Sequence, residues 1–295
     1  MIASSAEANG RFPRAQQLIL DPGDPTHLVL RTTFGIVTSR DDGASWSWIC
    51  EKAVGYGGVE DPAIAVSTGS AILAGHFSGL SRSADRGCNW DIAGGGLAGR
   101  RVIDLTVERD APSHVTVLAS VSIDGQSVTE LHASTDAGAS FKDLGSDLPS
   151  GMMGLTLDRA PSQPTRLYLS AVVNDQGEIL RSDDDGATFT RIPIPGASSA
   201  NAPYIAAVDP NDADTLWIRI AGSEEGVLML SRDAGATFQE VLRAPAELRG
   251  FALAPDGKTV FAGFGGGTAA AELGIWTADT DALVFEQVYR EPVSC

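Results

Sequence analysis

The chain has 295 residues, of which 43% are hydrophobic and 20% charged, so it can bury a sizeable core in one large domain or two ordinary ones. Its 38 acidic and 21 basic side chains give a formal net charge of −17, which disfavours nucleic acids and anionic membranes, because both are bound through basic patches. No apolar run approaches the roughly eighteen residues of a membrane span, so the composition excludes a membrane-embedded or disordered chain.

The first predicted strands show how each part of the chain is built. An alternating apolar strand at 17–20 leads through a turn with Pro and Gly into a second strand at 27–33. A turn at 34–35 opens the third strand, and residues 45–49 begin the fourth. The same order returns at 205–210, 215–220, 227–230 and 238–241. This pattern predicts a repeated unit of four antiparallel strands.

A short motif, Ser-x-Asp-x-Gly-x-x-(Trp/Phe), closes the third strand of each unit. Its five good copies begin at Ser39, Ser83, Ser134, Ser182 and Ser231. A sixth copy begins at Thr277, with Asp281 in place of the glycine and one extra residue before Phe285, so we expect it to form the least regular turn. In such a turn Ser and Asp side chains bind backbone amides, and the glycine adopts a positive φ.

The spacing of this motif predicts the fold. Successive copies begin 44 to 51 residues apart, which fits a four-stranded propeller blade and no helical repeat. We therefore expect an all-β chain that forms a six-bladed β-propeller of four-stranded antiparallel blades, as a single domain over residues 1–295. The expected blades are approximately 11–50, 59–94, 101–145, 152–195, 203–243 and 249–290.

The motif resembles the Asp-box, or BNR, repeat of sialidases, xyloglucanase-type glycosidases, sortilin-like receptor domains and propeller-type photosystem assembly factors. The resemblance extends roughly from Arg11 to Tyr289. In that superfamily the box is a folding element on the face away from the ligand site. The resemblance therefore implies that acidic clusters such as 183–185 are structural turns, with a calcium site as the less favoured alternative. We expect no metal and no cofactor.

The opposite face, formed by the links between blades and the turns between second and third strands, is the expected functional face. Residues at the start of each innermost strand should point toward the mouth of the central channel there. Arginine and tyrosine dominate the energetics of binding interfaces, and arginine also binds carboxylates in a bidentate manner. The candidate binding residues on this face are Arg11, Tyr56, Glu60, Asp61, Arg101, Asp104, Tyr204 and Arg249.

Two classes of function compete for this face. The first is a non-enzymatic scaffold that binds a protein or a carbohydrate, which the short, glycine-rich loops and the few tryptophans favour. The alternative is a glycoside hydrolase of sialidase-like or related Asp-box type, with unknown catalytic residues. The resemblance to sialidases rests on Arg11-Phe12-Pro13 at the start of the first strand. Sialidases use a tyrosine as the nucleophile, and Tyr204 has the side chain for that role. In an ordinary glycosidase, Glu60 or Asp61 would act with Asp104 as the carboxyl pair.

The first residues of the chain and its cysteines bear on the cellular compartment in which the protein is found. Residues 1–9 lack the basic and apolar regions of a signal peptide, so either a leader has been removed or the protein is cytoplasmic. The extracellular habit of the superfamily and the presence of only three lysines favour a secreted or periplasmic monomer. Two alternatives stay open for the thiols: a bridge between Cys50 and Cys88 with Cys295 free, or three unpaired cysteines.

Overall fold

The computed structural model describes residues 13–222, 225–265 and 272–291. The predicted fold class is confirmed: the chain is all-β, with six antiparallel blades of the propeller type, each formed by four consecutive strands. The chain divides into two compact units. The first comprises residues 1–121 and 132–143, and the second comprises 122–131 and 144–295.

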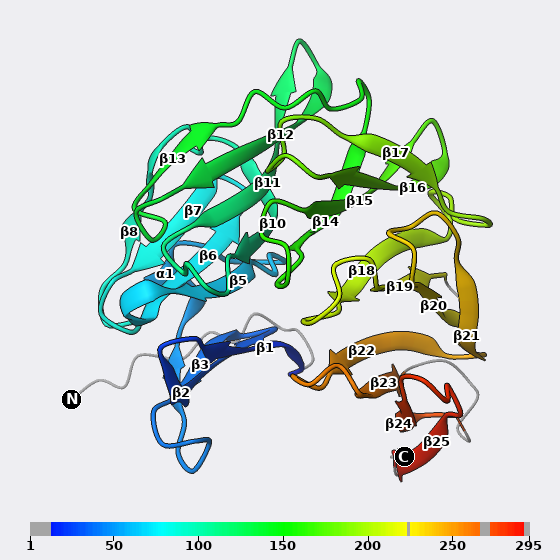
Figure 1. Ribbon diagram of the computed structural model, residues 1–295. Helices are drawn as coiled ribbons and strands as arrows, with labels where there is room; N and C mark the ends of the chain where they lie inside the picture. The colour runs from blue at the N-terminus through cyan, green and yellow to red at the C-terminus, as the bar shows by residue number, and fades with distance from the viewer. Residues whose placement is uncertain (1–12, 223–224, 266–271, 292–295) are drawn as a thin grey trace. The chain divides into compact units, whose positions relative to one another are not determined.

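The first unit contains the first three blades, apart from the hairpin tip at 122–131 (Figure 1). Blade one consists of β1 (Ala15–Asp21), β2 (Asp24–Thr32), β3 (Gly35–Ser39) and β4 (Ser47–Ile49). Blade two consists of β5 (Ala63–Ser67), β6 (Ala71–His76), β7 (Gly79–Ser83) and β8 (Asp91–Ile92). Blade three consists of β10 (Arg101–Val107), β11 (Val115–Ile123), β12 (Gln126–Ser134) and β13 (Ser140–Asp143).

Three short elements interrupt this order in the first unit. They are the helix α1 (Glu51–Val54), the 3-10 turn η1 (Thr68–Ser70) and the strand β9 (Gly94–Gly95). β9 pairs in parallel with β13, so the sheet of blade three gains a fifth strand from the link that precedes it.

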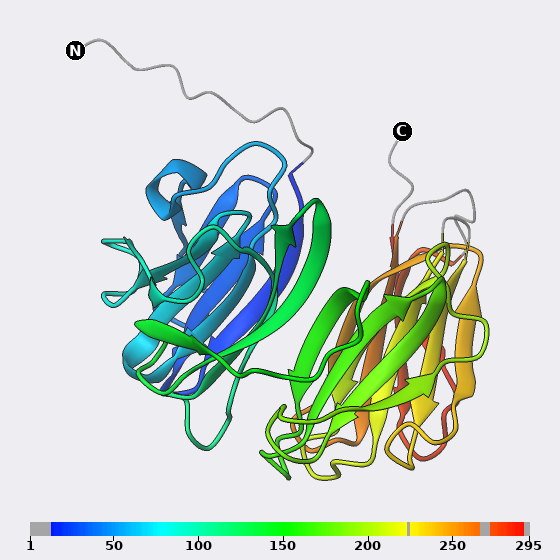
Figure 2. The ribbon, with the colours of Figure 1, turned by 90° about the horizontal axis from the view of Figure 1, so that it is seen from above.

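The second unit contains blades four to six, whose sheets lie side by side from green to red in Figure 2. Blade four consists of β14 (Met153–Arg159), β15 (Leu167–Val173), β16 (Gln176–Ser182) and β17 (Thr190–Pro193). Blade five consists of β18 (Ala202–Val208), β19 (Leu216–Ala221), β20 (Gly226–Ser231) and β21 (Gln239–Ala244). Blade six consists of β22 (Glu247–Leu253), β23 (Thr259–Gly265), β24 (Gly274–Asp279) and β25 (Glu286–Arg290).

The hydrophobic core lies between neighbouring blades. In blade four every residue of β15 is buried. The outer strands β4 and β25 are largely exposed. One cluster joins blades two and three through Leu80 and Phe141, and another joins blades four and five through Ile179 and Ile218. A blade is therefore stabilised mainly by its neighbours.

The repeated Ser-x-Asp-x-Gly turn has the same hydrogen bonds in all five good copies. In the first, Ser39 Oγ donates to Asp41 Oδ1 at 2.8 Å and accepts the Gly43 amide at 2.8 Å. The Asp41 carboxylate then accepts the Ser45 amide at 2.8 Å and the Ser45 hydroxyl at 2.6 Å. The glycine has a positive φ, and so does the residue before it, Asp42 at +56°. The side chain two residues after the glycine, which is Ser, Thr or Asn in every good copy, thus completes the turn.

The sixth turn departs from this pattern, as its sequence predicts. Asp279 Oδ1 accepts the amides of Asp281 and Ala282 at 2.9 and 3.0 Å, and the positive φ moves to Leu283 at +53°. Position 283 carries an apolar side chain, so it supplies no second donor to the carboxylate.

Arginines next to these turns join each blade to the following one. In each pair of neighbouring blades within a unit, such an arginine donates to a backbone carbonyl in the turn of the next blade. The bonds are Arg40 to Arg86, Arg82 to Ala137, Arg181 to Ala234 and Arg232 to Thr280, at 3.1, 2.9, 3.4 and 2.5 Å. In the first three pairs the accepting carbonyl belongs to the non-glycine residue with positive φ. The turn thus also presents an acceptor to its neighbour.

Replacing Arg82 with Met should lower the free energy of unfolding by about 1–2 kcal/mol. A hydrogen bond from a charged donor contributes about 1.5–3 kcal/mol, and Ser67 Oγ still donates to the Ala137 carbonyl at 3.2 Å in the variant. Urea denaturation measures the change. The control is Arg109→Met, whose side chain is half exposed and next to Asp110; it should change stability by less than about 0.5 kcal/mol. Equal effects in both variants would contradict the role of Arg82.

Replacing Asp136 with Ala should cost about 1–2 kcal/mol at neutral pH, because three donors lose their acceptor. Burial raises the pKa of Asp136, but the hydrogen bonds from Ser140 and Ser134 outweigh it and lower the pKa to about 2. The stabilisation is thus fully present above the pKa of the unfolded state, near 3.9, and is lost as the pH falls through about 2.

Unfolding titrations of both proteins at pH 6 and pH 2 check this second prediction. The difference between wild type and Asp136→Ala should shrink at the lower pH. Asp110→Ala, which removes an exposed carboxylate, is the control and should show little difference at either pH. A difference that grows on acidification would contradict the assignment.

Candidate functional site

Two of the predicted site residues in the first unit meet at the turn between β6 and β7. The Glu60 carboxylate accepts the backbone amide of Phe77 at 2.8 Å, and the Arg101 guanidinium lies over the Phe77 ring at 4.6 Å from its centroid. Phe77 is 48% exposed. Glu60 belongs to the link before β5, and Arg101 begins β10, so three separate segments fix this cluster. We call Glu60, Phe77 and Arg101 the Phe77 cluster.

A buried histidine lies directly behind this turn. His76 ends β6, with Nδ1 at 3.1 Å from Ser78 Oγ and Nε2 at 3.0 Å from Ser81 Oγ. Burial lowers the pKa of His76, while the negative charge of Glu60 partly opposes that effect. The turn that carries Phe77 is therefore held by His76, which contacts Ser78, and by Glu60, which accepts the Phe77 amide.

The remaining predicted residues of the first unit have other surroundings. Tyr56 is 6% exposed and packs in the core with Val54 and Ile64, so it offers little surface to a ligand. The Asp61 carbonyl accepts a hydrogen bond from Arg31 at 3.3 Å. Asp104 Oδ1 accepts the amide of Leu105 at 2.9 Å, next to a register shift in β10 that begins at Val102. Arg11 lies outside the described residues.

The second unit holds Tyr204 and Arg249. Tyr204 lies opposite Arg219 in the pairing of β18 with β19, and the Arg219 guanidinium lies 4.6 Å from the centroid of the Tyr204 ring. Arg219 also donates to the Leu248 carbonyl at 3.2 Å, and burial lowers the pKa of its guanidinium. Arg249 binds the Glu247 carboxylate through Nε at 2.9 Å and Nη2 at 2.8 Å.

Backbone irregularities help to place these side chains. In the pairing of first and second strands, five of the six blades have a register shift. Arg249 is the extra residue of such a shift between Leu248 and Gly250, and Arg101 precedes one in β10. A bulge bends its strand and changes the direction of nearby side chains. Simple alternation along the strand therefore does not determine where these arginines point.

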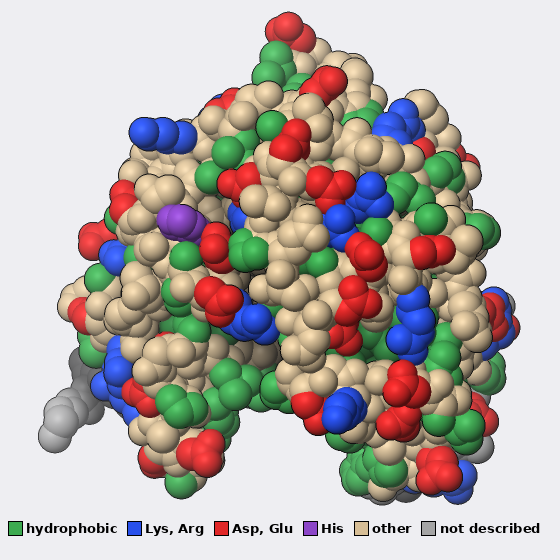
Figure 3. Space-filling model, in the orientation of Figure 1, with side chains coloured by type: hydrophobic (Ala, Val, Ile, Leu, Met, Phe, Trp, Pro, Cys, Tyr) green, Lys and Arg blue, Asp and Glu red, His purple; other side chains and the backbone are tan. Residues whose placement is uncertain are grey.

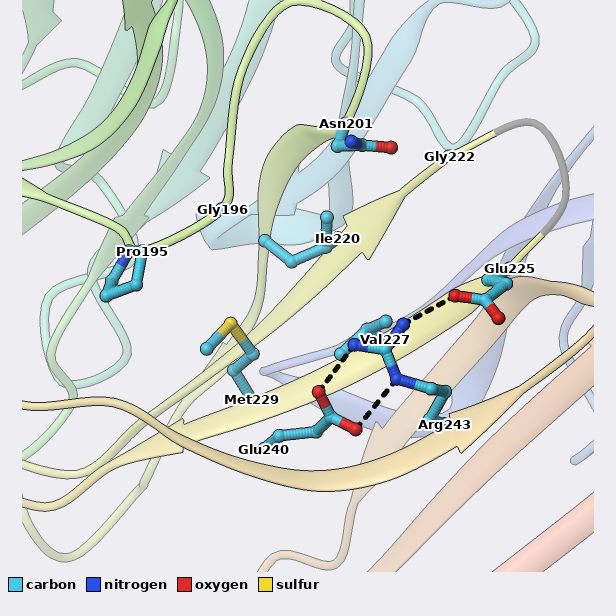
Figure 4. Close-up of a pocket in the computed structure, with 10 residues that line it drawn as sticks. All are labelled: Pro195, Gly196, Asn201, Ile220, Gly222, Glu225, Val227, Met229, Glu240 and Arg243. Carbon is cyan, nitrogen blue, oxygen red and sulfur yellow. Dashed lines mark hydrogen bonds and ion pairs between the residues drawn. The ribbon is translucent and has the colours of Figure 1, made fainter.

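A hollow on blade five was not foreseen from the sequence. It has a volume of about 350 Å³ and is lined by Pro195, Gly196, Asn201, Ile220, Gly222, Glu225, Val227, Met229, Glu240 and Arg243 (Figure 4). Its floor consists of cross-strand neighbours on one face of the sheet, because Val227 pairs with Ile220 on β19 and with Arg243 on β21. The link between blades four and five supplies the opposite wall.

Three charged side chains form the rim of this hollow. Arg243 binds Glu240 in a bidentate manner, through Nε at 2.8 Å and Nη2 at 2.6 Å, and its Nη1 binds Glu225 (Figure 4). The pKa of Glu240 is lowered by the hydrogen bond from Arg243, and the pKa of Arg243 is raised by the two carboxylates. Glu240 and Arg243 thus stay ionised near neutral pH, and the two carboxylates fix the arginine in one orientation.

The described part of the chain also shows how possible metal ligands and thiols are placed. Residues 13–222, 225–265 and 272–291 contain no group of three or more His, Cys, Asp or Glu placed to hold a metal ion. Cys50 and Cys88 are free thiols, and Cys295 lies outside the described residues. Within the same ranges, no helix is long and apolar enough to cross a membrane.

Comparisons with known proteins identify the fold of the chain but no family to which it belongs. No protein-family model and no curated protein matches the chain. Among solved structures, a GH74 enzyme of Niastella koreensis is 16% identical with a TM-score of 0.68, over 90% of this chain and 45% of that one. The GH74 xyloglucanase of Xanthomonas campestris is 19% identical with a TM-score of 0.63, over 88% and 44%. YCF48 of Cyanidioschyzon merolae is 14% identical with a TM-score of 0.59, over 93% and 84%.

These identities are too low to carry more than the fold. The chain spans less than half the length of the two GH74 proteins. Their likeness is therefore a likeness of propeller architecture, and the same architecture serves unrelated functions.

Replacing Glu60 with Gln should lower the pKa of His76 further, because the carboxylate is the charge that raises it against burial. The measurement is a pH titration of the histidine ring signals by NMR. His114, which contacts Glu108 instead, is the internal reference and should not move. The control variant is Asp61→Asn, which removes the neighbouring carboxylate and should leave His76 almost unchanged. A higher pKa of His76 in Glu60→Gln would contradict the arrangement.

Proposed function

We propose that this protein is a non-enzymatic binding scaffold of the Asp-box type, and that it binds a protein partner through the Phe77 cluster. The observation that carries the proposal is the exposed ring of Phe77, stacked under Arg101 and anchored through its backbone by Glu60. Aromatic and arginine side chains dominate the free energy of protein interfaces. Groups that are already ordered lose less entropy on binding, so the cluster suits a binding role.

Many carboxyl groups of the chain are unsuited to be the acid of a glycosidase. A glycosidase needs a carboxylic acid that stays protonated near neutral pH, which requires a raised pKa. Ten described Asp and Glu residues have a pKa that hydrogen bonds, in some cases with a nearby positive charge, hold below the ordinary value. These are Asp21, Asp24, Asp41, Asp85, Asp136, Asp175, Asp184, Asp233, Glu240 and Asp279. In the Phe77 cluster the carboxylate of Glu60 positions the turn instead.

Net charge indicates the kind of partner. With a formal charge of −17, the protein attracts basic surfaces over several ångströms and repels acidic ones. Figure 3 shows carboxylates spread over the visible face, with arginines and lysines between them. We therefore propose that the partner has a basic surface. We also propose that the protein is a monomer exported from the cytoplasm, so that it meets this partner outside the cytoplasm.

A glycoside hydrolase of Asp-box type is the second candidate, because GH74 enzymes share the fold. It would use Glu60 or Asp104 as a carboxyl group, with Arg101 beside the substrate.

Hydrolysis assays separate the two candidates. The full chain is incubated with xyloglucan and with sialyllactose at pH 4 to 8, and released reducing ends and free sialic acid are measured. We expect no release above the buffer blank at any pH. Hydrolysis that disappears in Glu60→Gln or Asp104→Asn would replace the scaffold proposal with the enzymatic one.

Site-specific photocrosslinking tests the binding surface itself. A photoreactive phenylalanine analogue at position 77 should capture a partner in an extract of the native host, and added salt should weaken the capture. The control is the same analogue at Ile92, which is 59% exposed and lies on β8 of the same blade. Arg101→Ala should reduce capture at position 77 by at least fivefold. Equal capture at both positions would refute the surface assignment.

A further inference from the structure

We propose that the hollow on blade five is a second, independent binding site, which accepts one aromatic side chain of a polypeptide partner against the guanidinium face of Arg243. Nothing in this proposal depends on the Phe77 cluster, which lies in the other unit. It rests on the shape of the hollow, the chemistry of its lining and the way Arg243 is held.

The floor of the hollow is apolar, and its wall consists of small residues. Ile220, Val227 and Met229 are each 8% exposed, so this part of the sheet is nearly but not fully covered by blade four. Pro195 and Gly196, in the link between blades four and five, form the wall across from this floor (Figure 4). A volume of about 350 Å³ is at the small end of ligand sites, and suits a single ring with its attachment.

Arg243 offers a flat surface at the edge of this floor. Its in-plane donors already bind Glu240 and Glu225, so a ligand meets the guanidinium through its face. A guanidinium face stacks on aromatic rings, and this attraction increases when the ring is removed from water. Met229 adds a thioether, which makes favourable contacts with aromatic edges.

The lining also argues against other ligands. None of the ten residues that surround the hollow is aromatic, so a sugar would find no ring to stack on, and the ring must come from the ligand. Two carboxylates against one guanidinium give the rim a net charge of −1, in a chain of net charge −17. An anionic ligand is therefore disfavoured, and a neutral or basic peptide segment is favoured.

NMR of the methionine methyl groups tests the site in the full chain. The probes are N-acetyl-tryptophanamide and N-acetyl-leucinamide, which differ in the side chain alone. We expect the tryptophan probe to shift the Met229 methyl signal by its ring current, with saturation at millimolar concentrations, and the leucine probe to produce less than a tenth of that shift. No shift, equal effects of both probes, or a larger response to methyl glucoside would overturn the proposal.

A conservative substitution tests the role of Arg243. Arg243→Lys keeps the charge but removes the planar face, so the tryptophan probe should bind at least fivefold more weakly. The matched control is Arg191→Lys in blade four, where Arg191 forms the same bidentate pair with Glu178 away from the hollow. It should leave binding unchanged. Melting temperatures confirm that both variants fold, and undiminished binding by Arg243→Lys would refute the stacking role.

Discussion

The carboxylate of the repeated turn is the constraint on which the rest of each unit depends. Asp136 accepts bonds from a residue before it and a residue after it, and so holds Ala137 at a positive φ that a non-glycine residue rarely adopts. In that conformation the Ala137 carbonyl faces blade two and accepts Arg82. The same relation recurs between blades one and two and between blades four and five, whereas in the last pair Arg232 binds the carbonyl of Thr280, which has no positive φ. A turn that is regular within its own blade thus also aligns that blade with the preceding one.

This arrangement leaves the opposite ends of the blades free to vary. The turns between second and third strands carry Phe77 in blade two, and Asn174 and Asp175 in blade four. The arginine bonds and the buried clusters join the blades elsewhere. Variation there changes the surface without changing the core, as is common for loops that carry function. The Phe77 cluster is one such surface.

The fold could be predicted because its signal is local and repeated, whereas the sites depend on contacts between distant segments. The motif contains the whole hydrogen-bonded turn, although the donor at positions such as Ser140 was not recognised as part of it. Glu60 and Arg101 were correctly placed near strand starts, but Phe77, which joins them, lies on a different hairpin. Tyr56, which follows α1 in the chain, belongs to the core with Val54 and Ile64. The hollow is assembled from four segments, none of which has a motif.

The number of acidic residues overstates the number of carboxylates available for chemistry. In each good turn both oxygens of the aspartate accept hydrogen bonds from its own turn, which leaves little capacity for a cation and keeps the group ionised. The aspartates of the five good turns are five of the 38 acidic residues of the chain. Glu240 and Glu225 act differently, because they orient an arginine rather than a backbone. In the repeated turns and at the hollow, then, carboxylates position other groups, and the two binding surfaces that we propose consist of arginines with apolar residues beside them.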